Sequence, residues 1–297
     1  FPMQAILLAA GYGTRLRPYT NIRPKPLFPV ANRPLLDRLL DQLHAAFAEP
    51  VLVNCHHLAD QIEAALGDRP EVLVQREAEI LGTGGSLRLA IDRLDNDPVL
   101  VINGDLFHDI DLERVYHHHL RSGFDVTMAL HDCPRFNTVR VADGRVLGFD
   151  EGDGERLAFT GIHVIDPDAI ERIPRQGFFH IIDLYRELAA AGRIGCCRVD
   201  GNLWRDIGTP ADYLDLHREL LAERGWLIDP TARVAADTVL DGWGCIGAGA
   251  RVGAGVQLRD SVVWDSAVVA DHTVCTGRIL TGDPAVDNGL GQRGTDE

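Results

Sequence analysis

Hydrophobic positions follow one pattern from residue 3 to about residue 225 and another pattern beyond it. In the first part, continuous apolar runs alternate with segments whose apolar residues recur at helical spacing. The runs predict strands buried on both faces, and they are 3–10, 50–55, 71–75 and 98–104. The helical stripes are 33–47, 58–66 and 85–94. This alternation predicts an α/β domain over residues 3–225, with a mostly parallel sheet and helices on both faces.

In a sheet of this kind, ligands bind at the carboxyl ends of the strands. The residues that follow Ala10, Gln75 and Asn103 lie at that edge if the predicted strands are correct. Binding and catalytic side chains are therefore expected at these three places.

Beyond residue 226 the apolar positions recur every six residues. The first run is Ile228, Val234, Leu240, Ile246, Val252 and Leu258, and after an offset of four residues the second run is Val262, Val268, Val274 and Leu280. Small residues fill the gaps, and this hexapeptide pattern is typical of a parallel β-helix. We therefore expect residues 226–282 to form a short left-handed parallel β-helix of about three coils. Residues 283–297 are polar and glycine-rich, which predicts a flexible tail.

A stack of so few coils has a small core and two ends that need cover. We expect it to pack on the first domain, on another subunit, or on both, with Val262, Val263 and Trp264 as exposed contact positions. A homo-oligomer is the expected assembly. The stack is expected to govern assembly and stability more than chemistry.

Composition excludes several classes of protein. Of the 297 residues, 45% are hydrophobic and 25% are charged, as in ordinary globular proteins. A net charge of −15 argues against nucleic acid as a partner, and no apolar run approaches the roughly 18 residues of a membrane span. The 6 cysteines show neither a C-x-x-C pair nor metal-ligand spacing, which favours reduced thiols and a cytoplasmic location.

The stretch LLAAGYGTRLRPYTNIRPKPLFPV, residues 7–30, follows the first predicted strand and gathers groups that bind phosphate. Gly11 and Gly13 let the backbone approach an anion closely, so that successive amide N–H groups can cradle it. Two glycines alone are weak evidence, because any tight strand-to-helix turn can contain them. Thr14 and Arg15 follow directly and strengthen the interpretation as a phosphate loop.

Lys25 is the only lysine among 29 basic residues. Arginine meets phosphate as a planar fork, whereas lysine is a compact point charge. The alternative interpretation of Lys25 is a solvated surface lysine. A chain that uses arginine everywhere else has little reason to keep an indifferent lysine, so Lys25 is predicted to reach a single reacting phosphorus centre.

Two aspartates lie where a metal site is expected. Asp105 follows Gly104 at the end of a buried strand, and Asp206 precedes a helix predicted to open at Pro210. A few carboxylates together with substrate phosphates are the ligands that Mg²⁺ prefers. For Asp111, in contrast, a helix cap is the better interpretation.

With these residues in view, the stretch LAAGYGTRLRPYT…RPKPLFPV resembles the signature G-x-G-T-R-L-x-P-x-T…P-K-P-L-x-P-V of the sugar-1-phosphate nucleotidylyltransferases. Four more segments match in family order: QREAEILGTGG is similar to the base-binding loop, INGD and WRDIGTP to the metal-binding segments, and FTGIHVI to the sugar-binding segment. The hexapeptide repeats resemble those of the mannose-1-phosphate guanylyltransferases. The resemblance implies a Rossmann-like nucleotidylyltransferase fold and the reaction NTP + sugar 1-phosphate → NDP-sugar + pyrophosphate.

The resemblance also implies roles for individual residues. Arg15, Lys25 and Asp105 would be catalytic, and Asp105 and Asp206 would hold Mg²⁺ as the cofactor. The residues implied to bind the nucleotide are Leu8, Ala10, Gly11, Gly13, Thr14, Gln75, Gly82 and Thr83. Those implied to bind the sugar phosphate are Asn103, Gly161, His180 and Arg156.

Two departures from the family pattern leave the sugar open. Many members carry a lysine after a Gly-Phe pair, but the stretch GFDEGDGERLAFTG has none, which leaves Arg156 as the substitute. His180 stands where many members have a glutamate. GTP with a mannose- or heptose-type 1-phosphate is favoured, and UTP with N-acetylmuramate 1-phosphate is the alternative. Two other classes are a hexapeptide acyltransferase, for which the repeats offer only His272 as a base, and a catalytically silent nucleotide-binding regulatory subunit.

Overall fold

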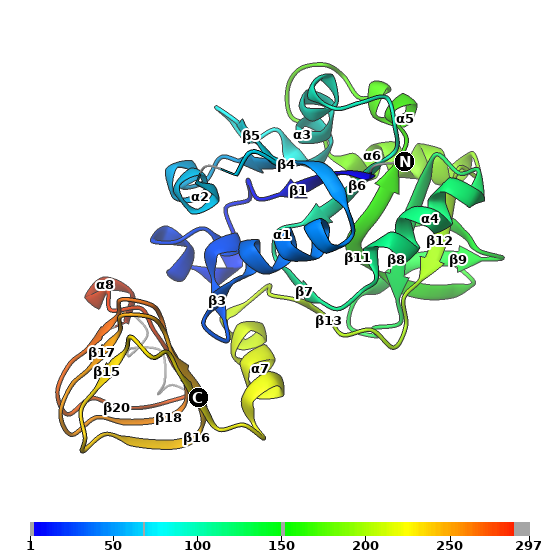
Figure 1. Cartoon of the computed structure of the whole chain (residues 1–297). Coiled ribbons are helices and arrows are strands. Elements are labelled where there is room, and N and C mark those ends of the chain that lie inside the picture. The colour runs from blue at the N-terminus through cyan, green and yellow to red at the C-terminus, as the bar shows by residue number, and fades with distance from the viewer. Residues whose placement is uncertain (1–2, 68, 150–151, 288–297) are drawn as a thin grey trace. The chain divides into compact units, whose positions relative to one another are not determined.

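The computed structural model describes residues 3–67, 69–149 and 152–287 (Figure 1). Within this part, the chain divides into two compact units. One unit joins the chain up to Gly11 with Arg38–Asp206, and the other joins Tyr12–Asp37 with the chain from Ile207 onward. We call Tyr12–Asp37 the lysine segment, because it contains Lys25. Among the described helices, none has the length and apolar character that crossing a membrane requires.

The first unit is built on a sheet of nine strands, of which the first four are parallel (Figure 1). In order across the sheet they are β5 (Val72–Arg76), β4 (Ala48–Cys55), β1 (Met3–Leu8) and β6 (Val99–Asn103). The central residues of β1, β4 and β6 are almost fully buried, as their continuous apolar runs require. The four strands predicted in this region are confirmed, and their carboxyl ends lie at one edge of the sheet.

The other five strands make the sheet mixed rather than mostly parallel. They are β11 (Glu155–Ile165), β8 (Val126–His131), β12 (Ile194–Arg198), β10 (Arg145–Gly148) and β9 (Asn137–Ala142). β11 is antiparallel to β6 and β8, and β10 is antiparallel to β12 and β9. Asp143 and Gly144 join β9 to β10 with positive φ values, as in a tight hairpin. β12 and β8 are parallel, so this half contains both kinds of pair. A parallel pair needs a long crossover, which the β9–β10 hairpin lacks, and the prediction of a mostly parallel sheet is wrong in this half.

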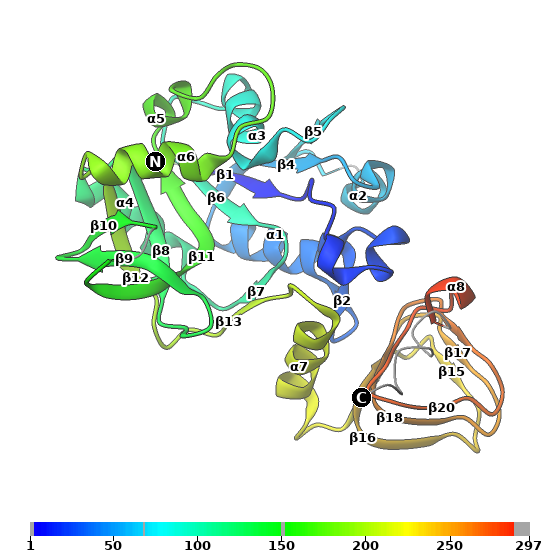
Figure 2. The same cartoon turned by 180° about the vertical axis from the view of Figure 1, so that it is seen from behind.

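Helices cover both faces of the sheet, with α4 (Leu112–Ser122) on one face and α6 (Ile181–Ala190) on the other (Figures 1 and 2). α6 shares a buried core with α5 (Pro167–Glu171), and this core also contains Val101 of β6 and Met128 of β8. The three predicted helices are confirmed as α1 (Leu35–Ala45), α2 (Ala59–Leu66) and α3 (Gly82–Ala90).

In the second unit, α7 (Pro210–Leu221) leads into short strands that pair in parallel. One sheet contains β14 (Trp226–Ile228), β16 (Val239–Ile246), β18 (Gln257–Val263), β20 (Val274–Thr276) and β21 (Ile279–Leu280), and another contains β15 (Arg233–Val234), β17 (Arg251–Val252) and β19 (Val268–Val269). Trp226 pairs with Gly244, and Gly244 pairs with Ser261, so the chain returns beside itself after 18 and then 17 residues. We call residues 226–280 the coil stack.

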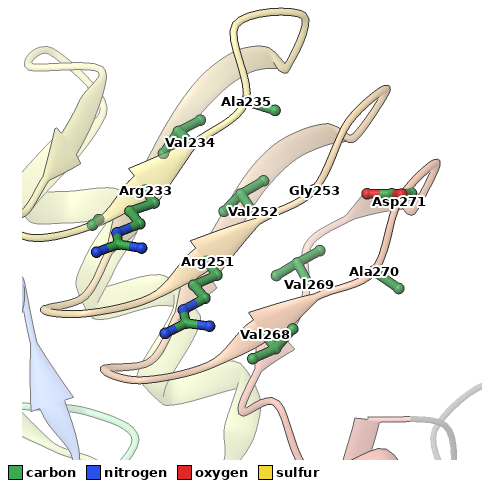
Figure 3. Close-up of a pocket in the computed structure, with 11 residues that line it drawn as sticks. Arg233, Val234, Ala235, Arg251, Val252, Gly253, Val268, Val269, Ala270 and Asp271 are labelled. Atoms are coloured by element: carbon green, nitrogen blue, oxygen red, sulfur yellow. The ribbon is translucent and has the colours of Figure 1, made fainter.

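Strand pairing corrects the predicted register of the second hexapeptide run. Val252 pairs with Val269, which lies in the buried core of the stack, whereas Val268 is 61% exposed. Figure 3 shows Val252 and Val269 pointing to one side of the rungs while Arg251 and Val268 point to the other. The predicted run is one residue early up to Val274, because the offset after Leu258 is five residues, to Val263, rather than four. The sequence cannot show this, since Val268 and Val269 are both aliphatic. The last member of the run, Leu280, pairs with Val263 and lies in the core as predicted.

The expected contact positions of the stack are buried, not exposed. Val263 belongs to its core, whereas Val262 and Trp264 are buried outside that core, at 0% and 1% exposure. α7 packs on β16 and β18. At the end of the stack, Pro284–Asp287 form a short helix, and the remainder of the predicted tail, 288–297, lies outside the described residues.

Candidate functional site

The parallel strands of the first unit end in a buried polar network. Asn54, near the end of β4, accepts a hydrogen bond from the Ala9 amide at 2.6 Å through Oδ1. Its Nδ2 donates to Glu77 Oε1 at 2.9 Å and to Ser86 Oγ at 3.1 Å. Gln75, on β5, donates from Nε2 to the same Glu77 oxygen at 3.2 Å and to the Ser86 carbonyl at 3.1 Å. The network therefore ties the ends of β1, β4 and β5 to α3.

Two acceptors in this network receive no hydrogen bond from the described residues: Gln75 Oε1 and Glu77 Oε2. Both side chains are 4% exposed. Leaving a buried acceptor without a donor costs about 1–3 kcal/mol, so these oxygens suit a ligand that donates hydrogen bonds. The sequence interpretation included Gln75 but missed Glu77 and Asn54. Their positions at or just past strand ends are the signal that could have identified them.

Gly82 and Thr83 begin α3, three residues earlier than the helix predicted from residue 85. Glycines make this start possible, because a Cβ at Gly84 would lie 2.6 Å from the Phe179 ring. The Gly84 amide also donates to the Phe179 carbonyl at 3.1 Å. The two predicted nucleotide-binding residues thus lie on the helix that Ser86 connects to Gln75.

The end of β6 brings together two residues implied to bind the sugar phosphate. A Cβ at Gly161, whose φ is +80°, would lie 2.6 Å from Asn103 Nδ2, so these residues are in contact. Next along the chain, the Gly104 amide donates to the Leu8 carbonyl at 2.8 Å. A Cβ at Gly104 would lie 2.7 Å from that oxygen, so a larger residue would push β6 away from β1.

The two candidate metal ligands lie on paired strands. Asp105 immediately precedes β7 (Leu106–His108), and Asp206 is the last residue of β13 (Trp204–Asp206). The strands are antiparallel, and Asp206 pairs with Leu106. Adjacent strands are about 5 Å apart, so the two carboxyl groups come from neighbouring positions although 100 residues separate them in the chain. Asp111, in contrast, caps α4 by accepting from the Arg114 amide at 2.9 Å, as predicted.

His108, the last residue of β7, adds no positive charge to this part of the chain. Burial lowers the pKa of His108 to about 4. Its Nδ1 accepts a hydrogen bond from the Ile110 amide at 3.1 Å. The imidazole is therefore neutral at pH 7.

Gly11 and Gly13, on either side of the start of the lysine segment, have different surroundings. Gly13 has a φ of +58°, and a Cβ there would lie 2.8 Å from Thr20 Cγ2 and 3.6 Å from Lys25 Cβ. Gly11, the last residue of the first unit before this segment, has open space around its Cα within 4 Å. Packing and φ thus require glycine at 13, whereas nothing among the described residues requires it at 11.

Lys25 is 7% exposed, which contradicts the alternative of a solvated surface lysine. In the same unit, Arg15 lies against the backbone at Gly208, where a Cβ would be 2.9 Å from Arg15 Nη1. Gly208 follows Asp206 by two residues in the chain. Arg15 therefore contacts the chain directly after the second candidate metal ligand. Thr14 precedes Arg15 as the first residue of a short 3-10 helix.

Two other residues implied to bind the sugar phosphate, Arg156 and His180, make local hydrogen bonds. Arg156 is five residues before Gly161 on β11, roughly 15 Å along an extended strand, and donates to the Gly152 carbonyl at 3.3 Å. His180 is exposed and caps α6, accepting from the Ile182 amide at 3.4 Å.

A groove on the coil stack is chemically different from these positions. It is lined by three successive rungs, with Arg233 and Arg251 one above the other and Asp271 at the far side (Figure 3). Most of its lining is alanine, valine and glycine, and it contains no residue implied to bind nucleotide or sugar.

The donor set at Asp105 and Asp206 fits a hard divalent cation that also binds substrate phosphates, since such a cation needs only one or two carboxylates from the protein. Within the described ranges, no group of three or more His, Cys, Asp or Glu side chains is arranged to hold a metal ion by itself. Phosphate oxygens would therefore complete the coordination.

Comparison with known proteins gives a consistent result. Residues 4–223 match the family model described as nucleotidyl transferase. The chain is 33% identical to the mannose-1-phosphate guanylyltransferase of Mycobacterium tuberculosis, over 90% of this chain and 81% of that protein. It is also 33% identical to the N-acetylmuramate alpha-1-phosphate uridylyltransferase of Caulobacter vibrioides, over 70% of this chain and 93% of that protein. A putative glucose-1-phosphate thymidylyltransferase structure from Bacillus anthracis shares the fold, with a TM-score of 0.64 and 22% identity over 72% of this chain and 93% of that chain.

Proposed function

Because the chain belongs to the nucleotidyl transferase family and is a sugar-1-phosphate nucleotidyltransferase, we propose that it transfers a guanylyl group from GTP to a mannose- or heptose-type 1-phosphate. A phosphate oxygen of the sugar 1-phosphate attacks the α-phosphorus of GTP. The bond from that phosphorus to the β-phosphate oxygen breaks, and pyrophosphate leaves on the opposite side. Such a reaction needs positioning and charge neutralisation more than covalent help from the protein.

The observation that carries the proposal is the pairing of β7 with β13, which makes Asp105 and Asp206 neighbours. We propose that these carboxylates hold Mg²⁺, which when bound supplies positive charge to the substrate phosphates. Arg15, against Gly208, is proposed to neutralise the departing pyrophosphate. Lys25 is proposed to place a compact cation on the reacting phosphates.

Nucleotide binding is proposed for residues at the ends of the parallel strands and in the loop that follows β1. The amides around Gly11, Gly13 and Thr14 would hold the triphosphate. The base and ribose would contact Leu8, Ala10, Gln75, Gly82 and Thr83. Asn103 and Gly161 would hold the sugar phosphate, with His180 and Arg156 as outer contacts.

The buried network supports GTP over UTP. The pairing edge of guanine carries two adjacent donor groups, N1–H and N2–H₂, whereas uracil carries one, N3–H. Gln75 Oε1 and Glu77 Oε2 are two buried acceptors that need donors. A site built around such groups rejects a ligand that leaves one of them unpaired.

Glu77→Gln is the variant that tests this base assignment. It keeps an oxygen for Asn54 and Gln75 but replaces the second acceptor by an NH₂ donor. We expect the preference for GTP over UTP, as a ratio of kcat/KM, to fall by about tenfold. Ser86→Ala in the same network is the control, because it removes a hydroxyl without changing these acceptors. If the preference for GTP over UTP is unchanged in Glu77→Gln, Glu77 does not recognise the base.

The second candidate is uridylyl transfer to N-acetylmuramate 1-phosphate, which the Caulobacter relative favours through 33% identity over 93% of its length. The match to the guanylyltransferase extends over 90% of this chain and so supports the first candidate. The deciding experiment measures pyrophosphate release over a matrix of nucleoside triphosphates and sugar 1-phosphates. Release of pyrophosphate with GTP and a hexose or heptose 1-phosphate supports the proposal. Release with UTP alone shows that the assignment of guanine is wrong. Release with no substrate pair shows that the proposed reaction is wrong.

The coil stack completes the proposal. We propose residues 3–225 as the catalytic domain and 226–282 as a left-handed β-helix. We further propose that the protein is a homo-oligomer and acts in the cytoplasm on small phosphorylated substrates.

A further inference from the structure

The lysine segment has little backbone structure of its own. Before α1 begins at Leu35, its helices are three single 3-10 turns, Thr14–Leu16, Tyr19–Asn21 and Lys25–Leu27, followed by two paired residues in each of β2 (Pro29–Val30) and β3 (Arg33–Pro34). Isolated turns of this kind make few hydrogen bonds and do not fix their own position. Lys25 lies in the last turn and is nevertheless buried. Contacts from other parts of the second unit must therefore hold it.

Two residues before Lys25, Arg23 is held by the coil stack. Its Nη1 and Nη2 donate to the two carboxylate oxygens of Asp265 at 2.6 and 3.0 Å. Such a two-bond pair fixes the orientation of the guanidinium as well as its position. The guanidinium carbon also lies 4.5 Å from the centre of the Trp264 ring.

Three residues after Lys25, Phe28 packs on the same tryptophan. The ring centres of Phe28 and Trp264 are 4.9 Å apart at 61°, and Tyr19 lies 6.1 Å from Trp264. Trp264 Nε1 donates to the hydroxyl of Tyr213 on α7 at 3.2 Å, and that hydroxyl donates to the Pro29 carbonyl. Edge-to-face rings with satisfied polar atoms define one arrangement rather than a loose apolar contact.

The far end of the segment is tied to the stack by Asn32. Its Nδ2 donates to the Ile246 carbonyl at 2.9 Å and to the Leu227 carbonyl at 3.2 Å. The neighbouring Ala31 amide donates to Nε2 of His217 on α7 at 3.1 Å. Lys25 thus lies between two anchors, one on each side in the chain.

We propose that the coil stack, through Asp265 and Trp264, positions Lys25 for nucleotidyl transfer, so that these two are positioning residues of the reaction. On this proposal the stack contributes to the chemistry as well as to assembly and stability. The inference rests on the proposed function for its kinetic readout. Its second readout, the reactivity of Lys25, does not depend on that function.

A charge exchange tests the ion pair. Asp265→Arg and Arg23→Asp should each lower kcat by about 100-fold, because a displacement of about 1 Å at the reacting groups has that effect. The double variant R23D/D265R restores opposite charges with their positions exchanged and should recover most of the lost kcat. Direct binding of substrate by Arg23 would not be restored by the exchange, so failure of the double variant overturns the positioning role.

Two further variants separate positioning from general stability. Arg259→Gln removes an arginine of the coil stack whose ion-pair partners, Asp241 at 3.3 Å and Asp260 at 3.7 Å, both belong to the stack. It should leave kcat unchanged. Asn32→Gly removes the hydrogen bonds from Asn32 to the coil stack without straining the backbone, because glycine readily adopts the φ of 62° found there. Like D265R, this variant should have a lower kcat. Thermal unfolding confirms that each variant is folded at the assay temperature.

The single lysine provides a readout without catalysis. An amine-reactive ester modifies Lys25 at a rate set by its accessibility, and peptide mass mapping separates that product from the labelled N-terminus. We expect modification of Lys25 to be about tenfold faster in D265R and N32G than in the unmodified sequence or R259Q, because the segment opens locally. The double exchange should slow it again.

The outcomes distinguish the inference from the function on which it rests. If the unaltered protein releases no pyrophosphate with any substrate pair, the proposed function fails, and lysine modification alone decides the inference. If the unaltered protein is active and D265R keeps both its kcat and its slow modification of Lys25, the inference is wrong. Coordinated loss in D265R and recovery in the double exchange establish it.

Discussion

The carboxyl edge of the parallel strands and the lysine segment supply different halves of the proposed chemistry, and they are held in different ways. At the strand edge, continuous backbone ladders on both sides of β1 fix the positions of Asn54 and Asn103. In the lysine segment, single 3-10 turns are held by side chains from the coil stack, such as Asp265 on Arg23. A ladder tolerates most side-chain changes, whereas a side-chain anchor is lost with one substitution. The strand edge should therefore be robust and the lysine segment sensitive to distant changes.

The largest effect is expected for the two candidate metal ligands, whose positions are fixed by the pairing of β7 with β13. Asp105→Asn and Asp206→Asn should each abolish Mg²⁺-dependent pyrophosphate release, because a neutral amide oxygen is a poorer ligand for a hard cation. Unfolding should not change, since the β7–β13 pairing uses backbone groups. Asp111→Asn is the matched control and should be fully active, because asparagine caps a helix as well as aspartate does. Activity of either first variant at ordinary Mg²⁺ concentrations would make that aspartate structural.

The next effect lies in the lysine segment. Lys25→Arg should lower kcat by about 10²–10³-fold, because the wider guanidinium cannot occupy the same buried point. Lys25→Met should do at least as much damage while its thermal midpoint barely moves. Steady-state pyrophosphate release and thermal unfolding are the two measurements. Turnover near that of the unaltered protein in Lys25→Arg would exclude the proposed role.

A smaller effect is expected from alanine substitutions at Gly13 and Gly11, which lie on either side of the start of the lysine segment. Gly13→Ala should lower the free energy of unfolding by roughly 1–2 kcal/mol, because its φ is +58° and a Cβ would meet Thr20 Cγ2 at 2.8 Å. Gly11→Ala should leave stability unchanged, since a Cβ there meets nothing within 4 Å. If the amide groups at Gly11 approach the triphosphate, the KM for nucleotide should nevertheless rise. Equal effects of the two variants on stability would contradict this distinction.

The smallest effect is expected in the coil stack, where it tests which of Val268 and Val269 faces the core. Val269→Ala should lower the free energy of unfolding by roughly 2 kcal/mol, because two buried carbons are lost and a cavity remains. Val268→Ala should stay within about 0.5 kcal/mol, since that side chain is largely exposed. Chemical denaturation of the two variants is the measurement, and a reversed order would restore the register predicted from the sequence.

Local pattern was sufficient for the strand edge and for part of the stack. Apolar runs long enough to be buried on both faces predicted the four parallel strands and the helices α1 to α3 between them. The hexapeptide period predicted coils that return after three hexads, and the pairing of Trp226 with Gly244 agrees. These signals are local, since each records which face of one element is buried.

The mixed half of the sheet and the coil register depend on information that is not local. In the sheet, β11 lies directly beside β6, although four strands, β7 to β10, separate β6 from β11 in the chain. The choice between Val268 and Val269 depends on the length of one return, which only pairing with Val252 reveals. Glu77 and Asn54 were missed because periodicity in the sequence identifies the buried face of an element, and a single polar residue near a strand end does not contribute to such a pattern.

By itself, the sequence determined which residues are candidates for phosphate chemistry, because the functional groups of its glycines, one lysine and two aspartates in a motif are fixed before any folding. Tertiary structure decided how those residues are held. The pairing of β7 with β13 makes Asp105 and Asp206 neighbours, and packing on Trp264 ties the lysine segment to residues more than 200 positions later. The physical reason is that charge and hydrogen-bonding capacity belong to a residue, whereas its position in space depends on contacts that only the folded chain makes.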